Sequence, residues 1–459
     1  MRRLIGSLVG LSRNTLYRRT SFILVVESLG KVFLFATTFV AASVLPSAEF
    51  ALFGVLLAVQ QFVTIVAQGG LVEAVLGKVG KITDADGRSR VYRASFRAFG
   101  WSASVAFVAV LVWAGGLSPL PGWRGLAAAV ALLSGALMSS AVLLRTNFIM
   151  LEGHTTRSCL IKGLLYLSGS SGGLLLLVVE RTASSYYWGY LVFVVPVSLY
   201  ALVLGRGASP KAQDDGALAK GLILRSLPFA STSLLAWASS SGATLVIYRF
   251  FDARTTACYT LMTSISGILV FATSSVNLGW QPEMLKSMHG TGHSVEESRR
   301  RLAGIMEVAL LGCAVVLLLA VALARDRAVW FPAKYPEMEF ILPLAFAAIL
   351  GNLNYFVTVN QYMFYGAGGQ FLRISFYGYL LGGALWFALG YRFGEIGVFL
   401  GWGMVILVRG AAVSRIAARN WKFLSDPWQT ARVMVAFAAF VYLLSFNPQV
   451  QALRHLYHM

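Results

Sequence analysis

The chain has 459 residues, of which 57% are hydrophobic and 12% are charged, with a mean hydropathy of +0.70. Soluble globular domains do not carry so much apolar surface, so this composition predicts an all-α polytopic membrane protein. The formal net charge of +19 does not indicate a nucleic-acid partner, because the basic residues are spread over many short connections. The three cysteines fall at unrelated positions and the histidines lie in connections or the tail, so we expect no metal, no cofactor and no disulfide framework.

The first long apolar stretch, residues 20–44, follows a basic segment and contains an acid and a base near its middle. About 20 apolar residues suffice to cross the hydrocarbon core, so this stretch predicts a transmembrane helix. Glu27 and Lys31 are spaced i, i+4 with the acid first, the better order for a helical ion pair. Two interpretations stay open: the pair neutralises itself so that the helix can insert, or it lies in a polar transport cavity.

Twelve further apolar spans follow in the sequence, and the last of them is barely longer than the minimum of about 17 residues. If the N-terminus is cytoplasmic and every span crosses, about three times as many Lys and Arg residues fall on the cytoplasmic side as outside, which supports this orientation. The spans are expected near residues 48–76, 97–117, 123–149, 160–179, 186–205, 227–248, 257–281, 303–323, 338–366, 370–391, 396–417 and 430–447.

The spans predict two halves that are joined by a solvated linker rich in Gly, Ser, Pro, Lys and Asp. Residues 44–76 and 251–285 share one plan, a short turn and then a long helix with a polar middle. Such repeats in transporters indicate two bundles around a central site, although chance similarity between apolar helices also explains them. The expected parts are a basic cytoplasmic segment (1–19), an N-terminal six-helix bundle (20–205), a cytoplasmic linker (206–226), a C-terminal six-helix bundle (227–417), and a cytoplasmic connection, marginal thirteenth helix and tail (418–459).

Three stretches resemble one transporter family. Residues 45–54, LPSAEFALFG, look like the start of the second helix of polysaccharide-biosynthesis flippases. These Wzx-like O-antigen and exopolysaccharide flippases belong to the MOP transporter superfamily, which also contains the MATE exporters. Residues 248–282, with an acidic turn, Tyr259 and a closing Gln-Pro, are similar to that family's seventh and eighth helices. Residues 352–420, first rich in Asn and Tyr and then in Gly, are similar to its later helices.

The resemblance implies two six-helix bundles around a central cavity in the bacterial inner membrane. It further implies a flippase that moves a polyprenyl-diphosphate-linked oligosaccharide to the outer leaflet by alternating access. The implied partners are this glycan lipid, the membrane lipid, a polysaccharide polymerase and glycosyltransferases.

A diphosphate needs positive charge in the cavity, and few cations lie within spans. Arg409 lies about midway along its span, whereas Arg145 and Arg249 lie near span ends, where snorkelling to the interface is the simpler explanation. Two intramembrane carboxylates, Glu27 and Glu307, are candidates for proton coupling because burial favours the neutral form of a carboxyl group. The candidate cavity cations are Lys31, Arg409, Arg249 and Arg145.

The sugar needs amides and hydroxyls, which several spans supply. Gln61, Thr64 and Gln68 fall at i, i+3 and i+7 on one helical face. Such groups in membranes also bridge helices, and that role competes with ligand contact. The candidate glycan contacts are Gln61, Thr64, Gln68, Ser240, Asn354 and Gln361.

Two rival functions share parts of this pattern. A MATE-type, ion-coupled exporter of drugs or cations is favoured by Glu27 and disfavoured by Lys31 and Arg409. A polysaccharide polymerase or ligase would need reactive side chains in a sizeable outer loop, and the outer connections are short, the richest being residues 324–339. The sequence therefore favours a transporter that is not an enzyme.

Overall fold

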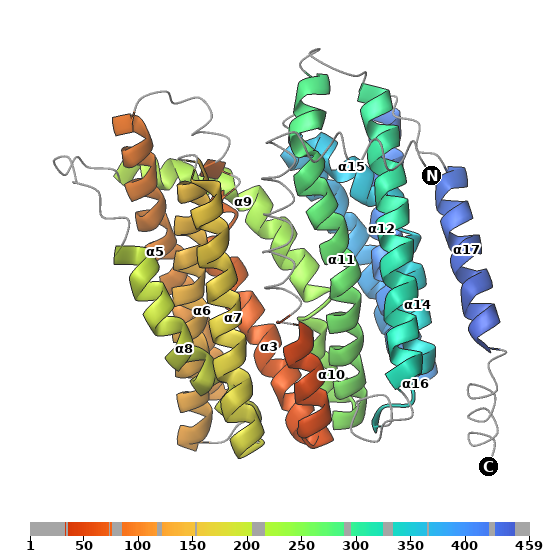
Figure 1. Cartoon of the computed structure of the whole chain (residues 1–459), viewed down its shortest axis with the longest axis horizontal. Helices are drawn as coiled ribbons and strands as arrows, with labels where there is room; N and C mark the ends of the chain where they lie inside the picture. The colour runs from red at the N-terminus through yellow and green to blue at the C-terminus, as the bar shows by residue number, and fades with distance from the viewer. Residues whose placement is uncertain are drawn as a thin grey trace. The chain divides into compact units, whose positions relative to one another are not determined.

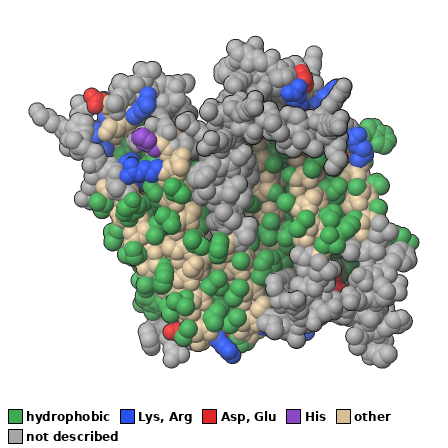
Figure 2. All heavy atoms as spheres, in the orientation of Figure 1, with side chains coloured by type: hydrophobic (Ala, Val, Ile, Leu, Met, Phe, Trp, Pro, Cys, Tyr) green, Lys and Arg blue, Asp and Glu red, His purple; other side chains and the backbone are tan. Residues whose placement is uncertain are grey.

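All regular elements that the computed structural model describes are α-helices (Figure 1). Eight of these helices are long and apolar enough to cross a membrane, and a bent pair makes a ninth such span. On the face shown in Figure 2, hydrophobic side chains cover the middle of the helices and Lys and Arg gather near the helix ends. The predicted all-α, multi-pass membrane protein is confirmed. The structure describes residues 33, 35–72, 74–75, 85–116, 122–151, 154–203, 216–288, 295–324, 334–364, 367–421 and 427–445.

Helices occupy every span predicted from residue 48 onward, whereas the span predicted at 20–44 is described only in its last part, where residues 35–44 are helical. The first helices are α3 (Ser47–Gln68), α5 (Ala85–Gly116), α6 (Gly122–Leu151), α7 (Thr155–Glu180), α8 (Ala183–Val203), α9 (Gly216–Ala238) and α10 (Ala243–Phe250). The later helices are α11 (Ala253–Met288), α12 (Val295–Ala324), α14 (Met338–Leu350), α15 (Leu353–Phe364), α16 (Gly368–Trp421) and α17 (Pro427–Ser445).

The chain forms two compact units, Met1–Thr260 and Leu261–Met459. The linker predicted at 206–226 is only partly described, and from Gly216 onward it is helical. Ala219, Leu222 and Ser226 are buried at i, i+3 and i+7, so one face of α9 packs against its neighbours from the start. This amphipathic face is the physical reason why α9 begins earlier than the polar composition suggested.

The first unit is tightly packed because glycines of α7 lie directly against aromatic rings of α8. A Cβ atom added to Gly173 would lie 2.3 Å from the Tyr186 ring, and one added to Gly169 would lie 2.5 Å from the Tyr190 ring. Small residues permit such close helix contacts in membranes. Helix α3 joins this packing through Phe53, whose ring meets the Tyr186 ring edge-on at 5.2 Å.

In the second unit, α16 is a helical hairpin with almost no turn. Its 54 residues would extend about 80 Å as one helix, far more than the roughly 30 Å of a hydrocarbon core. Gly394 breaks it with a φ of 59°, a conformation that glycine adopts at little cost. A Cβ atom on Gly382 would lie 2.8 Å from the Cα atom of Val405, so the two halves are in backbone contact. The separate spans predicted at 370–391 and 396–417 are these two halves.

Two breaks interrupt the helices, and one of them lies within the bent pair that can form a span. Residues 239–242 form turns between α9 and α10, and residues 351–352 separate α14 from α15 with a bend of 43°. Breaks of this kind free backbone groups within the membrane, and they are tolerated where protein or a cavity surrounds them. The side chains around the two breaks are therefore the first places to look for a functional site.

Candidate functional site

An arginine near the middle of a span is the most unusual feature of the second unit. Arg409 lies in the second half of α16, about 22 Å along the helix from Gly394. Its guanidinium carbon lies 4.5 Å from the centroid of the Tyr355 ring, 4.6 Å from that of Tyr379 and 6.0 Å from that of Phe371. Its Nη2 also donates a hydrogen bond to the Tyr355 hydroxyl. These three rings and the arginine form what we call the Arg409 cage.

No acid among the described residues balances the charge in the cage. Within the part of the chain that the structure describes, no carboxylate pairs with Arg409, and its Nε atom is buried without a hydrogen-bond partner. Arginine stays protonated in proteins, and the ring faces offset only part of its desolvation, about 2 kcal/mol for a favourable contact. The cage therefore holds a net positive charge that an anion would neutralise.

The break between α14 and α15 helps to position the cage. Asn352 is only 6% exposed, and its side chain lies against Gly410, where an added Cβ atom would be 1.4 Å from Asn352 Oδ1. On the other side of the arginine, a Cβ atom on Gly378 would lie 3.0 Å from the Cα atom of Arg409. Gly410 thus leaves room for the Asn352 side chain, and Gly378 lets the two backbones of α16 approach and brings Tyr379, which follows it, to the guanidinium group.

Helix α15 is fastened to its neighbours by hydrogen bonds at both ends. The Tyr362 hydroxyl donates to the Val413 carbonyl at 2.9 Å, which fixes the end of α15 to α16. Asn354, a predicted glycan contact, donates through Nδ2 to the Thr430 hydroxyl of α17 at 3.0 Å. Asn354 thus bridges helices here, and the side chain of Gln361, another predicted contact in α15, lies beyond what the structure describes.

The predicted proton-coupling residues are placed only in part. Glu307 lies in α12 and is partly buried, and its Oε2 accepts a hydrogen bond of 2.9 Å from the side-chain amide of Gln429 in α17. Glu27 and Lys31, the ion pair proposed in the first span, lie outside the described residues. Of these groups, the structure therefore assigns a partner to Glu307.

In the first unit, polar side chains connect α3 to the break between α9 and α10. Gln61 is exposed, and its Oε1 accepts a hydrogen bond of 2.5 Å from the Ser241 hydroxyl. One turn earlier on α3, the Ala58 carbonyl accepts a hydrogen bond of 2.9 Å from the indole N–H of Trp237. This arrangement gathers an amide, a hydroxyl and an indole beside an interrupted span, which are groups suited to contact a sugar.

The other polar residues predicted in this unit are engaged within it. The Ser240 hydroxyl donates to the Ala236 carbonyl at 2.7 Å, and the Ser240 carbonyl accepts a bond of 3.1 Å from the Tyr259 hydroxyl. Thr64 donates to the backbone of its own helix at 3.0 Å, and Gln68 is the last residue of α3. Ser240 and Thr64 therefore support the helices around Gln61.

The remaining predicted cations occupy different environments in the first unit. Arg145 is 6% exposed near the end of α6, with its guanidinium carbon 4.7 Å from the centroid of the Tyr92 ring. Arg249 is exposed in the last turn of α10, where a snorkelling residue is expected. Both lie in the unit Met1–Thr260, whereas Arg409 lies in the other unit.

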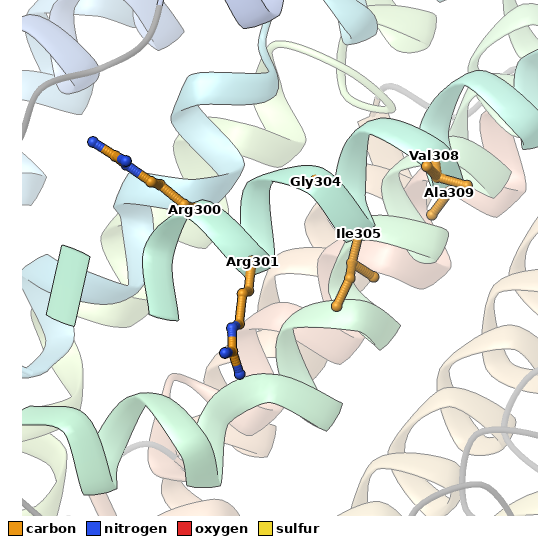
Figure 3. A pocket seen from close by; sticks show the side chains of 6 residues that line it. All are labelled: Arg300, Arg301, Gly304, Ile305, Val308 and Ala309. Atoms are coloured by element: carbon orange, nitrogen blue, oxygen red, sulfur yellow. The ribbon is translucent and has the colours of Figure 1, made fainter. Parts of the chain in front are cut away.

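A hollow of about 560 Å³ lies along one side of α12 (Figure 3). Arg301 and Ile305 point to the same side of the helix in this view, and Arg301 pairs with Glu297 at 2.7 Å. None of the described residues that line the hollow has an amide or hydroxyl side chain, the groups that a glycan requires. Its lining residues are Arg300, Arg301, Gly304, Ile305, Val308 and Ala309.

Sequence reasoning found Arg409 but missed the residues of its cage. Tyr355, Tyr379 and Phe371 lie in apolar spans, where aromatic residues usually indicate core packing. The sequence did contain one indication of partners on other segments. Residues 405 and 413, one helical turn before and after Arg409, are both valine, so no acid stands there to pair with the arginine. A mid-span arginine without an acid one helical turn away must find its partners on other segments.

At the level of sequence, no family model and no curated protein matches the chain. Solved structures do match its fold. The MATE multidrug transporter DinF-BH superposes with a TM-score of 0.62 over 88% of this chain and 95% of that chain, at 14% identity. A mutant of the Vibrio cholerae MATE transporter VcmN gives a TM-score of 0.57 over 90% and 98%, at 17% identity. An inward-facing MATE family transporter of the MOP superfamily gives 0.55 over 89% and 96%, at 16% identity.

These similarities, together with the apolar spans, define a class of protein: a multi-pass, all-helical membrane protein. Its fold is similar to that of the MATE transporters named above. The fold class predicted from the sequence is thereby confirmed. The predicted Wzx-like branch, the lipid-linked substrate and the inner membrane remain proposals.

Proposed function

We propose that this protein is a MOP-type flippase that moves a polyprenyl-diphosphate-linked oligosaccharide from the inner to the outer leaflet of the bacterial inner membrane by alternating access. The observation that carries the proposal is the Arg409 cage, a mid-span cation that pairs with no described carboxylate. The proposal of a MOP-type transporter rests on the fold, and the proposal of a diphosphate-linked substrate rests on this positive charge.

Physical chemistry favours a phosphate group as the partner of this cation. Two opposite unit charges about 4 Å apart attract each other by about 4 kcal/mol at an effective dielectric constant of 20, several times more than in water. The guanidinium group presents planar, forked donors that match phosphate oxygens, and Tyr355 accepts from one end of the fork. Arg409 therefore suits the diphosphate of a lipid carrier better than a cationic drug.

Polar groups near the turns between α9 and α10 supply the kinds of side chain that a sugar ligand requires. Gln61 is exposed beside Ser241 and Trp237, and carbohydrates are bound by amides, hydroxyls and aromatic faces.

We also propose Glu27 and Glu307 as proton-coupling groups, with the bond from Gln429 as the feature that couples Glu307 to α17. A polymerase and glycosyltransferases that use the same glycan lipid are the expected partners.

A MATE-type exporter of organic cations is the second candidate, because all three of the similar folds named above are MATE transporters. Such an exporter needs an acidic binding site. The described part of the chain instead places at mid-span an arginine that pairs with no described carboxylate, and this charge would repel a cationic ligand. The two candidates therefore make opposite predictions for the charge of the ligand.

Ligand charge can be tested directly with the purified full-length protein in nanodiscs. We expect farnesyl diphosphate to quench tryptophan fluorescence saturably, and farnesol and ethidium to bind much more weakly. Arg409→Gln should weaken diphosphate binding at least about tenfold, which corresponds to roughly 1.4 kcal/mol. The matched control is Arg415→Gln, which removes an exposed charge from the same helix and should leave affinity unchanged. Tight ethidium binding with no diphosphate binding would support the cation exporter instead.

A further inference from the structure

The last described helix, α17, packs on the unit that contains the Arg409 cage. It has 19 residues, so it is about 28 Å long, and it contacts α12, α14 and α15. These are the two halves of the broken span and the helix that carries Glu307. The helix therefore packs against both halves of the broken span, and one of these halves, α15, contributes Tyr355 to the cage.

Two hydrogen bonds from the first turn of α17 fix it there. Gln429 donates to the Glu307 carboxylate at 2.9 Å, and the neighbouring Thr430 accepts from the Asn354 amide at 3.0 Å. All four side chains are partly buried. Polar bonds between helices stabilise specific pairings within membranes, because the alternative is an unsatisfied group in an apolar environment.

The bond to Asn354 acts at a point where α15 has little support from its own chain. Helix α15 has 12 residues and begins directly after the break, so no continuous helix holds its first turn in place. Tyr355 is the next residue, and it contributes both a ring face and a hydroxyl group to Arg409. A shift of Asn354 would therefore move Tyr355 relative to the guanidinium group.

We propose that α17 is a positioning helix for the cage: Gln429 and Thr430 clamp the start of α15 between α12 and α17 and thereby hold Tyr355 against Arg409. The clamp itself follows from the contacts within this unit, whereas its effect on a ligand rests on the proposed function. Gln429 and Thr430 contact no ligand in this proposal, so their substitution should act through α15.

Hydrogen–deuterium exchange of the full-length protein in nanodiscs, without ligand, tests the clamp. Thr430→Val removes the hydroxyl acceptor at constant volume and should increase exchange in residues 353–359 about fivefold. Thr430→Ser keeps a hydroxyl and should leave exchange nearly unchanged. Tyr442→Ala removes a side chain that is 62% exposed near the other end of α17 and should also have no effect on α15.

An exchange of partners tests the second bond. Gln429→Glu places two carboxylates face to face and should release α17, whereas combining it with Glu307→Gln restores one donor and one acceptor. We expect faster exchange in α15 for the single variant and recovery in the double variant. If Thr430→Val and Gln429→Glu both leave exchange in α15 unchanged while folding normally, the clamp does not exist.

Farnesyl diphosphate binding is the second readout. The affinity should fall about fivefold in Thr430→Val and Gln429→Glu and recover in the double variant. Faster exchange in α15 with unchanged affinity would overturn the positioning role. If the wild-type protein binds no diphosphate, the proposed function fails, and the exchange experiment still decides whether α17 clamps α15.

Discussion

Replacing Gly410 with alanine should disturb the cage through a single added methyl group. The new Cβ atom would lie 1.4 Å from Oδ1 of Asn352, which is 6% exposed and has little free space into which to move. Overpacking of this kind costs about 1–3 kcal/mol, and the better helix propensity of alanine returns up to about 1 kcal/mol. We therefore expect a net loss of about 1–2 kcal/mol, together with a displaced break beside Arg409.

The matched control is Gly383→Ala, in the other half of α16, where an added Cβ atom meets nothing within 4 Å. Thermal unfolding in detergent should show Gly410→Ala about 2–6 °C below this control, and farnesyl diphosphate binding should weaken only in Gly410→Ala. If the two variants unfold at the same temperature and bind equally well, Asn352 does not pack against Gly410 as described.

Three further predictions test other parts of the molecule. Arg409→Ala should abolish delivery of the glycan lipid to the outer leaflet in cells while the protein remains in the membrane; normal delivery, measured by surface labelling, would contradict its role. Gly173→Ala, which places a Cβ atom 2.3 Å from a tyrosine ring of α8, should lower thermal stability by about 1–3 kcal/mol, whereas Gly221→Ala meets nothing within 4 Å and should not. The nearby Thr255 side chain and a hydrogen bond from the Thr255 backbone N–H lower the pKa of Asp252 in the turn before α11. The contribution of Asp252 to stability is therefore complete above its unfolded pKa and is lost as the pH falls through its folded pKa. The melting temperature should thus fall more between about pH 5 and pH 3 for the wild type than for Asp252→Asn, and equal falls would refute this linkage.

Apolar length and breaks in it were enough to predict the spans, because the membrane imposes one simple requirement on each helix. The hairpin of α16 was predictable as two spans, because its apolar stretch is too long for one membrane-spanning helix. The start of α9 was not, because Lys220 and Gly216 suggested a linker while the buried face of the helix depends on its neighbours.

The candidate site was predictable one residue at a time but not as an arrangement. Arg409 was found because a mid-span charge is costly, yet its partner Tyr355 lies 54 residues away in sequence. Likewise Glu307 was noted as a carboxylate, whereas its partner Gln429 lies 122 residues further on, in a helix that was only marginal by length. Partners at such distances are determined by tertiary packing, which leaves no local pattern in the sequence.

The glycine contacts of the α16 hairpin have a consequence for access to Arg409. Because Gly382 and Gly378 hold the two halves of α16 at backbone contact, Arg409, Tyr379 and Phe371 belong to one stiff body. Among the described rings around the guanidinium group, Tyr355 alone comes from a separate helix. Any widening of the cage would therefore require α15 to give up its bonds to Val413 and Thr430, rather than the hairpin to spread.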